Sequence, residues 1–184
     1  MRISSSSNQN QRRVFRLGGV LASGLALVSL GAAPAYGAPT LGQAVRVGAE
    51  TCLSLLAGAD LNVIGDRNGL KRQDGGWVVP AGASAVIDFL PPRGANPNVC
   101  TMFVSHQADD QTVMFEALTQ WAAAGQPPFT KVADREQAAA GNRLTTTWRG
   151  GHAGRDVTLI LSKPVEAQQE SLESTVMVVA DPRR

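Results

Sequence analysis

The C-terminal third of this chain decides the fold, with LTTTW at residues 144–148, DVTLILS at 156–162 and STVMVVA at 174–180. Each segment is rich in β-branched residues and has the length of a β-strand. Residues 149–155 separate the first two segments and contain three glycines, which supply the backbone freedom that a tight turn needs. The polar run Gln168-Gln169-Glu170 lies in the second connection. We therefore predict an antiparallel meander of three strands.

Two segments before the meander have the apolar spacing of amphipathic helices, residues 41–57 and 110–124. The apolar stripe of the first is made by Leu41, Val45, Ala49, Cys52 and Leu56. The stripe of the second is made by Val113, Met114, Ala117, Leu118 and Trp121. Asp109 or Asp110 is expected to cap the second helix, and Gly125 to end it. A weaker helical turn is expected over residues 61–71.

Strands are expected before and after the second helix. Residues 77–79, 84–90 and 99–105 have strand-like composition, and a further short strand is expected around residues 129–132. The element order is then α-(α)-β-β-β-α-(β)-β-β-β. We predict an α+β fold, in which a predominantly antiparallel sheet of about five to six strands carries two main helices packed on one face.

The first 37 residues have the pattern of a cleaved N-terminal export signal. A polar start leads to Arg12-Arg13, then to an apolar stretch over residues 17–33 and to small residues ending at Gly37. The apolar core is too short and too often interrupted by glycine for a comfortable membrane anchor, so we expect no stable membrane insertion after cleavage. We expect cleavage after Gly37, with Ala33-Pro34-Ala35 as a rival site. One compact α+β domain over residues 38–184 then remains.

The export route has two interpretations. Arg12 and Arg13 give the signal a twin-arginine character, which is typical of proteins exported after folding. The alternative is an ordinary secretory signal with a basic start. Both interpretations predict a bacterial protein that is periplasmic or secreted.

Removal of the signal changes the charge of the protein. Four arginines and no acidic residue lie in residues 1–37, so 13 of the 17 basic residues remain against 15 acidic ones, a formal net charge of −2. The basic pI of the whole chain therefore describes the precursor. No basic stripe interleaved with aromatic residues remains, and we expect no nucleic-acid partner.

The chain has two cysteines, Cys52 in the first helix and Cys100 in a strand. Exported proteins meet oxidising conditions, so we predict that the two form a disulfide that ties the helix to the sheet. Two buried free thiols are the alternative. The two cysteines lack the C-x-x-C spacing of a redox pair and the further ligands of a zinc site, so we interpret them as structural.

Few residues are candidates for chemistry. A metal or hydrolase site would need His106, Asp109 and His152 to converge in a concave pocket. The simpler interpretation is that the aspartate caps a helix and that both histidines are exposed loop residues. No Gly-x-Ser-x-Gly turn and no phosphate-binding loop is present. We therefore predict no catalytic, cofactor-binding or metal-binding residues.

The aromatic residues offer a different kind of site. Trp77, Trp121 and Trp148 are expected to be core residues in the first place, because tryptophan among apolar neighbours is usually buried. A polar surface of the meander is the candidate binding face, made by Thr145, Thr147, Arg149, Arg155, Thr158 and Trp148.

We predict an exported, non-catalytic binding or envelope-interaction module whose partner is an envelope protein or a small ligand. The alternative is a small periplasmic hydrolase with a site around His106, Asp109 and His152.

Overall fold

The structure, a computed structural model, describes residues 39–82, 85–125, 128–137, 142–166 and 171–182. The predicted export signal lies outside the described residues, as does the connection at Gln168-Gln169-Glu170. Three helices are described: α1 Leu41–Leu56, α2 Leu61–Arg67 and α3 Asp110–Ala124. The strands are β1 Lys71–Gln73, β2 Gly76–Val79, β3 Ala85–Leu90, β4 Val99–Gln107, β5 Thr130–Gln137, β6 Arg143–His152, β7 Arg155–Pro164 and β8 Ser171–Ala180.

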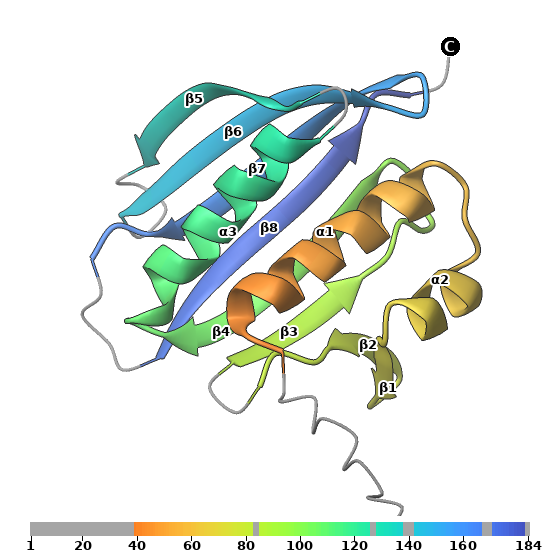
Figure 1. The fold of residues 1–184 in the computed structure, drawn as a ribbon, viewed down its shortest axis with the longest axis horizontal. Coiled ribbons are helices and arrows are strands. Elements are labelled where there is room, and N and C mark those ends of the chain that lie inside the picture. Colours follow the sequence, from red (N-terminus) through yellow and green to blue (C-terminus); the bar gives the residue numbers. More distant parts are fainter. Residues whose placement is uncertain (1–38, 83–84, 126–127, 138–141, 167–170, 183–184) are drawn as a thin grey trace, which may run out of the picture. The chain divides into compact units, whose positions relative to one another are not determined.

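The strands form one antiparallel sheet in the order β1-β2-β3-β4-β8-β7-β6-β5 (Figure 1). The α+β class, the antiparallel sheet and the C-terminal meander are confirmed, but the sheet has eight strands where five to six were predicted. The strands least visible in the sequence are the two edge strands. β1 and β5 are almost wholly exposed, so they carry no alternation of buried and exposed residues that a pattern could detect.

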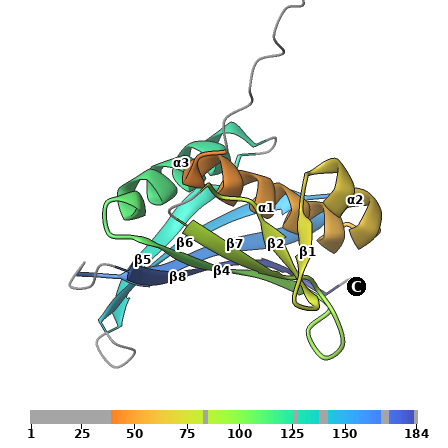
Figure 2. The same ribbon diagram turned by 90° about the horizontal axis from the view of Figure 1, so that it is seen from below.

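Helices α1 and α3 lie side by side on one face of the sheet, as Figures 1 and 2 show. The predicted stripe of α1 is buried throughout. The predicted stripe of α3 is confirmed in part: Met114 and Leu118 are buried, but Gln111 and Ala122 complete the buried side, and Val113 is 46 % exposed. Inward-pointing residues of the central strands, such as Met102, Leu159 and Val176, complete the core.

Small residues let α1 approach its neighbours closely. A Cβ atom on Gly48 would lie 2.2 Å from the sulfur of Met102, and one on Gly42 would lie 3.0 Å from the Cβ of Ala117. Thr40 caps α1 in a reciprocal arrangement with Gln43, which satisfies amide groups that the first turn leaves free. The helix is therefore fixed on both the sheet and α3.

A disulfide ties α1 to the sheet. The sulfur atoms of Cys52 and Cys100 are 2.05 Å apart, and both residues are fully buried. The bond closes a loop of 48 residues. In the chain-entropy model such a loop contributes roughly 4 kcal/mol to stability, a large share of the ~5–15 kcal/mol typical of a domain.

The turn between β6 and β7 is shorter than predicted. Only Ala153 and Gly154 form it, with φ angles of 50° and 74°. Positive φ angles at both positions are typical of a two-residue β-hairpin turn. Gly150 lies within β6, where a Cβ atom would come within 2.8 Å of the ring of Phe129. His152 is therefore a strand residue and pairs with Arg155.

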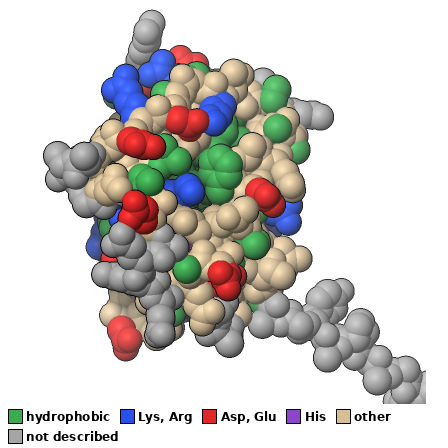
Figure 3. Space-filling view, turned by 90° about the vertical axis from the view of Figure 1, so that its left-hand side faces the viewer, with side chains coloured by type: hydrophobic (Ala, Val, Ile, Leu, Met, Phe, Trp, Pro, Cys, Tyr) green, Lys and Arg blue, Asp and Glu red, His purple; other side chains and the backbone are tan. Residues whose placement is uncertain are grey.

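Charged and apolar side chains are mixed on the side of the domain where β4 ends and α3 begins. Figure 3 shows hydrophobic side chains gathered near the middle of this side, with acidic and basic ones interspersed around them. The amine of Lys163 lies 5.6 Å from the ring centroid of Phe115, a cation–π contact. In the described part of the chain, no helix is long and apolar enough to cross a bilayer.

Candidate functional site

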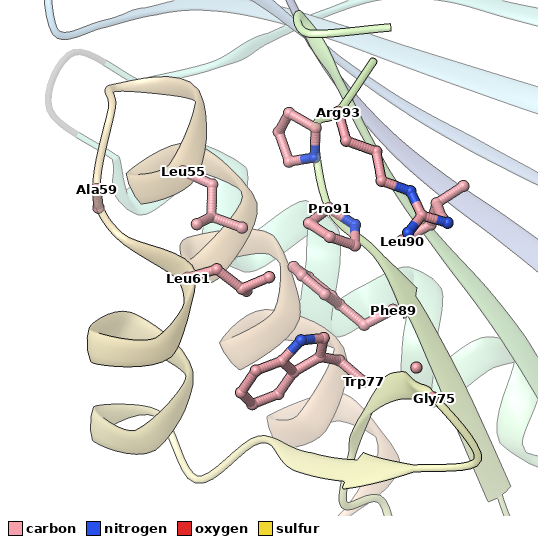
Figure 4. Close-up of a pocket in the computed structure, with 11 residues that line it drawn as sticks. Leu55, Ala59, Leu61, Gly75, Trp77, Phe89, Leu90, Pro91 and Arg93 are labelled. Carbon is pink, nitrogen blue, oxygen red and sulfur yellow. The ribbon is translucent and has the colours of Figure 1, made fainter. Parts of the chain in front are cut away.

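An open pocket lies beside α2, between the end of α1, the β1–β2 hairpin and the end of β3 (Figure 4). Its volume is about 360 Å³, within the ~300–1,000 Å³ range of small-molecule sites. The lining residues are mostly apolar: Leu55, Ala59, Leu61, Gly75, Gly76, Trp77, Phe89, Leu90, Pro91, Pro92 and Arg93. We call it the Trp77 pocket.

The local sequence explains why Trp77 stands at this pocket. Trp77 pairs with Phe89 across β2 and β3, so both side chains point to the helix face of the sheet. The six-membered ring of Trp77 packs on Gly65 of α2, where a Cβ atom would lie 3.0 Å from Cζ3. Figure 4 shows the other edge of the indole, with its nitrogen, turned toward Phe89 and the pocket.

The polar side-chain atoms of the Trp77 pocket are hydrogen-bond donors. Trp77 offers its indole N–H and Arg93 its guanidinium, and the remaining lining side chains are apolar. Within the described residues, neither group has a hydrogen-bond or ion-pair partner of its own. The site can therefore bury an apolar group and donate hydrogen bonds to an acceptor on it.

A second, more polar pocket of about 450 Å³ adjoins the first. It shares Leu61 and Trp77 with the Trp77 pocket and adds Asn62, Arg72, Gln73 and Asp74. The guanidinium carbon of Arg72 lies 4.8 Å from the centre of the Trp77 ring, and Arg72 also donates a hydrogen bond to the Asn62 side chain. Arg72 therefore already has partners, and it holds the outer side of Trp77.

His106 corrects the sequence interpretation. It is not an exposed loop residue but lies in β4 and is only 2 % exposed. Its Nδ1 lies 2.8 Å from the carbonyl oxygen of Gln107, and its Nε2 lies 2.9 Å from Oγ of Ser174. A carbonyl oxygen only accepts, so Nδ1 donates to Gln107, and in the neutral imidazole Nε2 then accepts the hydrogen bond of the Ser174 hydroxyl. Sequence reasoning did not find Ser174, because the contact spans 68 residues.

The structure does not bring the three predicted residues together, because His152 lies far from His106. His106 faces Leu172 near the start of β8, whereas β7 meets the end of β8 at Val157 and Ala180, next to the hairpin of His152. At ~3.3 Å per residue along β8, the two histidines are roughly 25 Å or more apart. Asp109 is at the start of α3, and its side chain makes no capping hydrogen bond, contrary to the prediction. The described residues contain no group of three or more side chains able to hold a metal ion.

The predicted polar face of the meander is present only in part. Thr145, Thr147, Arg149 and Thr158 lie on the face opposite the helices, in register with one another or nearly so. Trp148 points the other way, is 2 % exposed and lies 6.2 Å from the Phe115 ring. Arg155 is also on the helix side, where it donates to the backbone oxygens of Leu56 and Asp181 and to the side chain of Asn98. Both residues are structural.

Comparison of the chain with protein-family models, with curated proteins and with solved structures found no match. The functional interpretation therefore depends on the chemistry of the Trp77 pocket.

Proposed function

We propose that this protein is an exported, non-catalytic binding module that holds an apolar group in the Trp77 pocket. The observation that carries the proposal is an open cavity of about 360 Å³ walled by Trp77, Phe89 and Leu61. Aromatic and aliphatic walls with a few polar groups are typical of ligand sites. Contact with an apolar ligand would remove this surface from water, a gain of about 25 cal/mol for each Å² buried.

The side chains of the pocket support binding over catalysis. The described lining side chains include no serine, cysteine, histidine, lysine or carboxylate, the groups that serve as nucleophiles and general bases. His106 and His152, two of the three residues considered for a hydrolase site, lie near opposite ends of the sheet. The Trp77 pocket can recognise a ligand, and its lining offers no group to transform it.

Export fits the disulfide, because a bond between Cys52 and Cys100 persists in an oxidising compartment such as the periplasm. We expect the signal over residues 1–37 to be removed. The intact mass of protein recovered from the periplasm or medium should match a chain that begins near Ala38. Recovery of the protein only in the membrane fraction with Met1 retained would contradict export as a soluble module.

The binding proposal is tested by titrating the purified chain with a neutral apolar probe, 1-octanol, and following the indole N–H signals in ¹⁵N–¹H spectra. We expect saturable shifts of the Trp77 signal, while the signals of Trp121 and Trp148 stay in place. Leu61→Ser should weaken binding, because it removes an apolar wall. The matched control is Val63→Ser on the same helix, since Val63 is 69 % exposed and does not line the pocket. Equal weakening by both variants, or no saturable shift, would refute the proposal.

A further inference from the structure

We propose that the ligand of the Trp77 pocket is a small hydrophobic carboxylic acid, with its apolar body against Trp77 and Phe89 and its carboxylate at Arg93. This inference rests on the proposed binding function and names the class of ligand. It follows from the positive charge of the pocket and from the hydrogen-bond donors that line it, rather than from its volume.

Among the described residues that line the Trp77 pocket, Arg93 alone is charged. No acidic side chain is found among these described lining residues, so none of them neutralises the positive charge. The ion pair of Lys131 with Asp134 lies on β5, at the far edge of the sheet from this pocket. An anionic group is therefore the complement that the pocket lacks.

The hydrogen-bonding capacity of the lining side chains points to the same class. Arginine has five N–H donors and no acceptor, and the tryptophan indole has one donor and no acceptor. A ligand that binds these groups must present acceptors. A carboxylate presents two oxygens, and its geometry matches the guanidinium fork in a bidentate pair.

Arg93 is better placed for this role than Arg72. Arg72 is stacked on Trp77, donates to Asn62 and shares its pocket with the carboxylate of Asp74. In contrast, the exposed Arg93 side chain has no such partner among the described residues. Figure 4 shows it extending past Pro91 toward Leu90, with the guanidinium turned away from Trp77. Under our proposal, this exposed side chain turns toward the mouth of the pocket when the carboxylate binds.

The backbone beneath Arg93 is well fixed. Pro91 and Pro92 precede it and restrict their own φ angles, and its carbonyl oxygen accepts a hydrogen bond of 3.0 Å from the amide of Asn96. Arg93 and Asn96 also form an isolated β-bridge. The loop therefore fixes the backbone of Arg93 at the rim of the pocket, and its side chain is exposed to solvent.

The test compares two probes of equal chain length, octanoate and 1-octanol, titrated into the full purified chain and followed at the Trp77 indole signal. Octanoate should bind roughly tenfold more tightly, as expected for a hydrogen bond to a charged group. Arg93→Gln should remove this preference by lowering the affinity for octanoate to the level of 1-octanol. The preference should also fall with added salt, because the pair is at the surface.

Two further variants complete the experiment. Arg149→Gln removes another exposed arginine, one that does not line the Trp77 pocket, and should leave the preference intact. Arg93→Lys should keep part of it. Equal affinities for the two probes, or a preference that survives Arg93→Gln, would overturn the assignment of a carboxylate ligand while leaving the binding module standing. Failure of both probes to bind would refute the binding module itself.

Discussion

The two ends of the helix-covered face differ in how completely they bury their aromatic residues. Under α3, Trp148 is fully buried and touches Phe115. Beside α2, Trp77 is only half buried and forms the wall of an open pocket. The covering helices explain the contrast, because α3 has 15 residues and α2 has only seven, of which Ile64 and Gly65 alone are buried. A short helix leaves aromatic surface that a long one would cover.

A glycine makes room for a large side chain both under α1 and at α2, but with different results. Gly48 allows Met102 to fill the core beneath α1, and Gly65 allows the Trp77 ring to lie on α2. In the first case the space is fully used, whereas in the second a cavity of about 360 Å³ remains beside the ring. Interiors are normally packed as tightly as organic crystals, so this contrast supports our proposal that a ligand binds at the α2 corner.

The largest expected effect separates the two tryptophans. Trp148→Ala should lower the free energy of unfolding by roughly 3–5 kcal/mol, because it leaves a large cavity in the core. Trp77→Ala should cost less than half as much, because the residue is only partly buried and its loss enlarges a pocket that is already open. Denaturant unfolding followed by circular dichroism measures both. Equal losses would mean that the α2 corner is ordinary core.

The disulfide is expected to have the next largest effect. Cys52→Ser and Cys100→Ser should each cost about 4 kcal/mol, and the double variant little more than either single one, since both remove the same bond. The control is a thiol titration of the unfolded, non-reduced protein, which should find no free thiol. Additive losses, or two reactive thiols per chain, would contradict a disulfide in the native protein.

The two histidines provide a smaller contrast. His106→Ala should cost roughly 1–3 kcal/mol, because the Ser174 hydroxyl would be left buried without its acceptor. His152→Ala, at the hairpin, should cost less than about 1 kcal/mol. Unfolding curves of the two variants and of Ser174→Ala provide the comparison. If both histidine variants were neutral, the hydrogen bond to Ser174 would not contribute to stability.

The smallest effect concerns the edge strand β5. The hydrogen bond from Lys131 lowers the pKa of Asp134, and the amine and carboxylate are 2.5 Å apart. A carboxyl whose pKa is lowered in the folded state stabilises the fold at pH values above its ordinary pKa. This stabilisation is lost as the pH falls through the lowered pKa. Lys131→Met should therefore raise the pKa of Asp134, as measured by NMR of its carboxyl carbon, with almost no change in stability at neutral pH. An unchanged pKa would show that the pair does not persist in solution.

Much of the fold could be predicted from the sequence, because it is encoded by local patterns. The apolar stripe of α1 and the alternation of buried and exposed residues in the last strands are periodic patterns within one element. Each can be recognised in a short window of sequence. The pairing of Cys52 with Cys100 also follows, because the chain offers no other cysteine. The edge strand β1 was not predicted, and of β5 only the beginning, around residues 129–132, was predicted, since exposed polar strands have no such pattern.

The candidate site could not be predicted, because it depends on elements that meet only in three dimensions. The sequence shows Trp77 between apolar residues and Pro91-Pro92-Arg93 in a loop, and nothing local connects the two. Their meeting depends on the β2–β3 register and on the position of α2. In the same way, the burial of His106 could not be predicted, because its partner Ser174 lies on β8 and meets it only through the pairing of β4 with β8.

The most direct test of the central claim is to fill the Trp77 pocket from within. Ala59 lines the pocket, and the Ala59→Phe variant should occupy it while leaving the strands and the other two helices unchanged. Titration with 1-octanol, followed at the Trp77 indole signal, should then show saturable binding to the native chain and at least roughly tenfold weaker binding to the variant. Equal affinity of the native chain and the Ala59→Phe variant would contradict the claim that this pocket is the binding site.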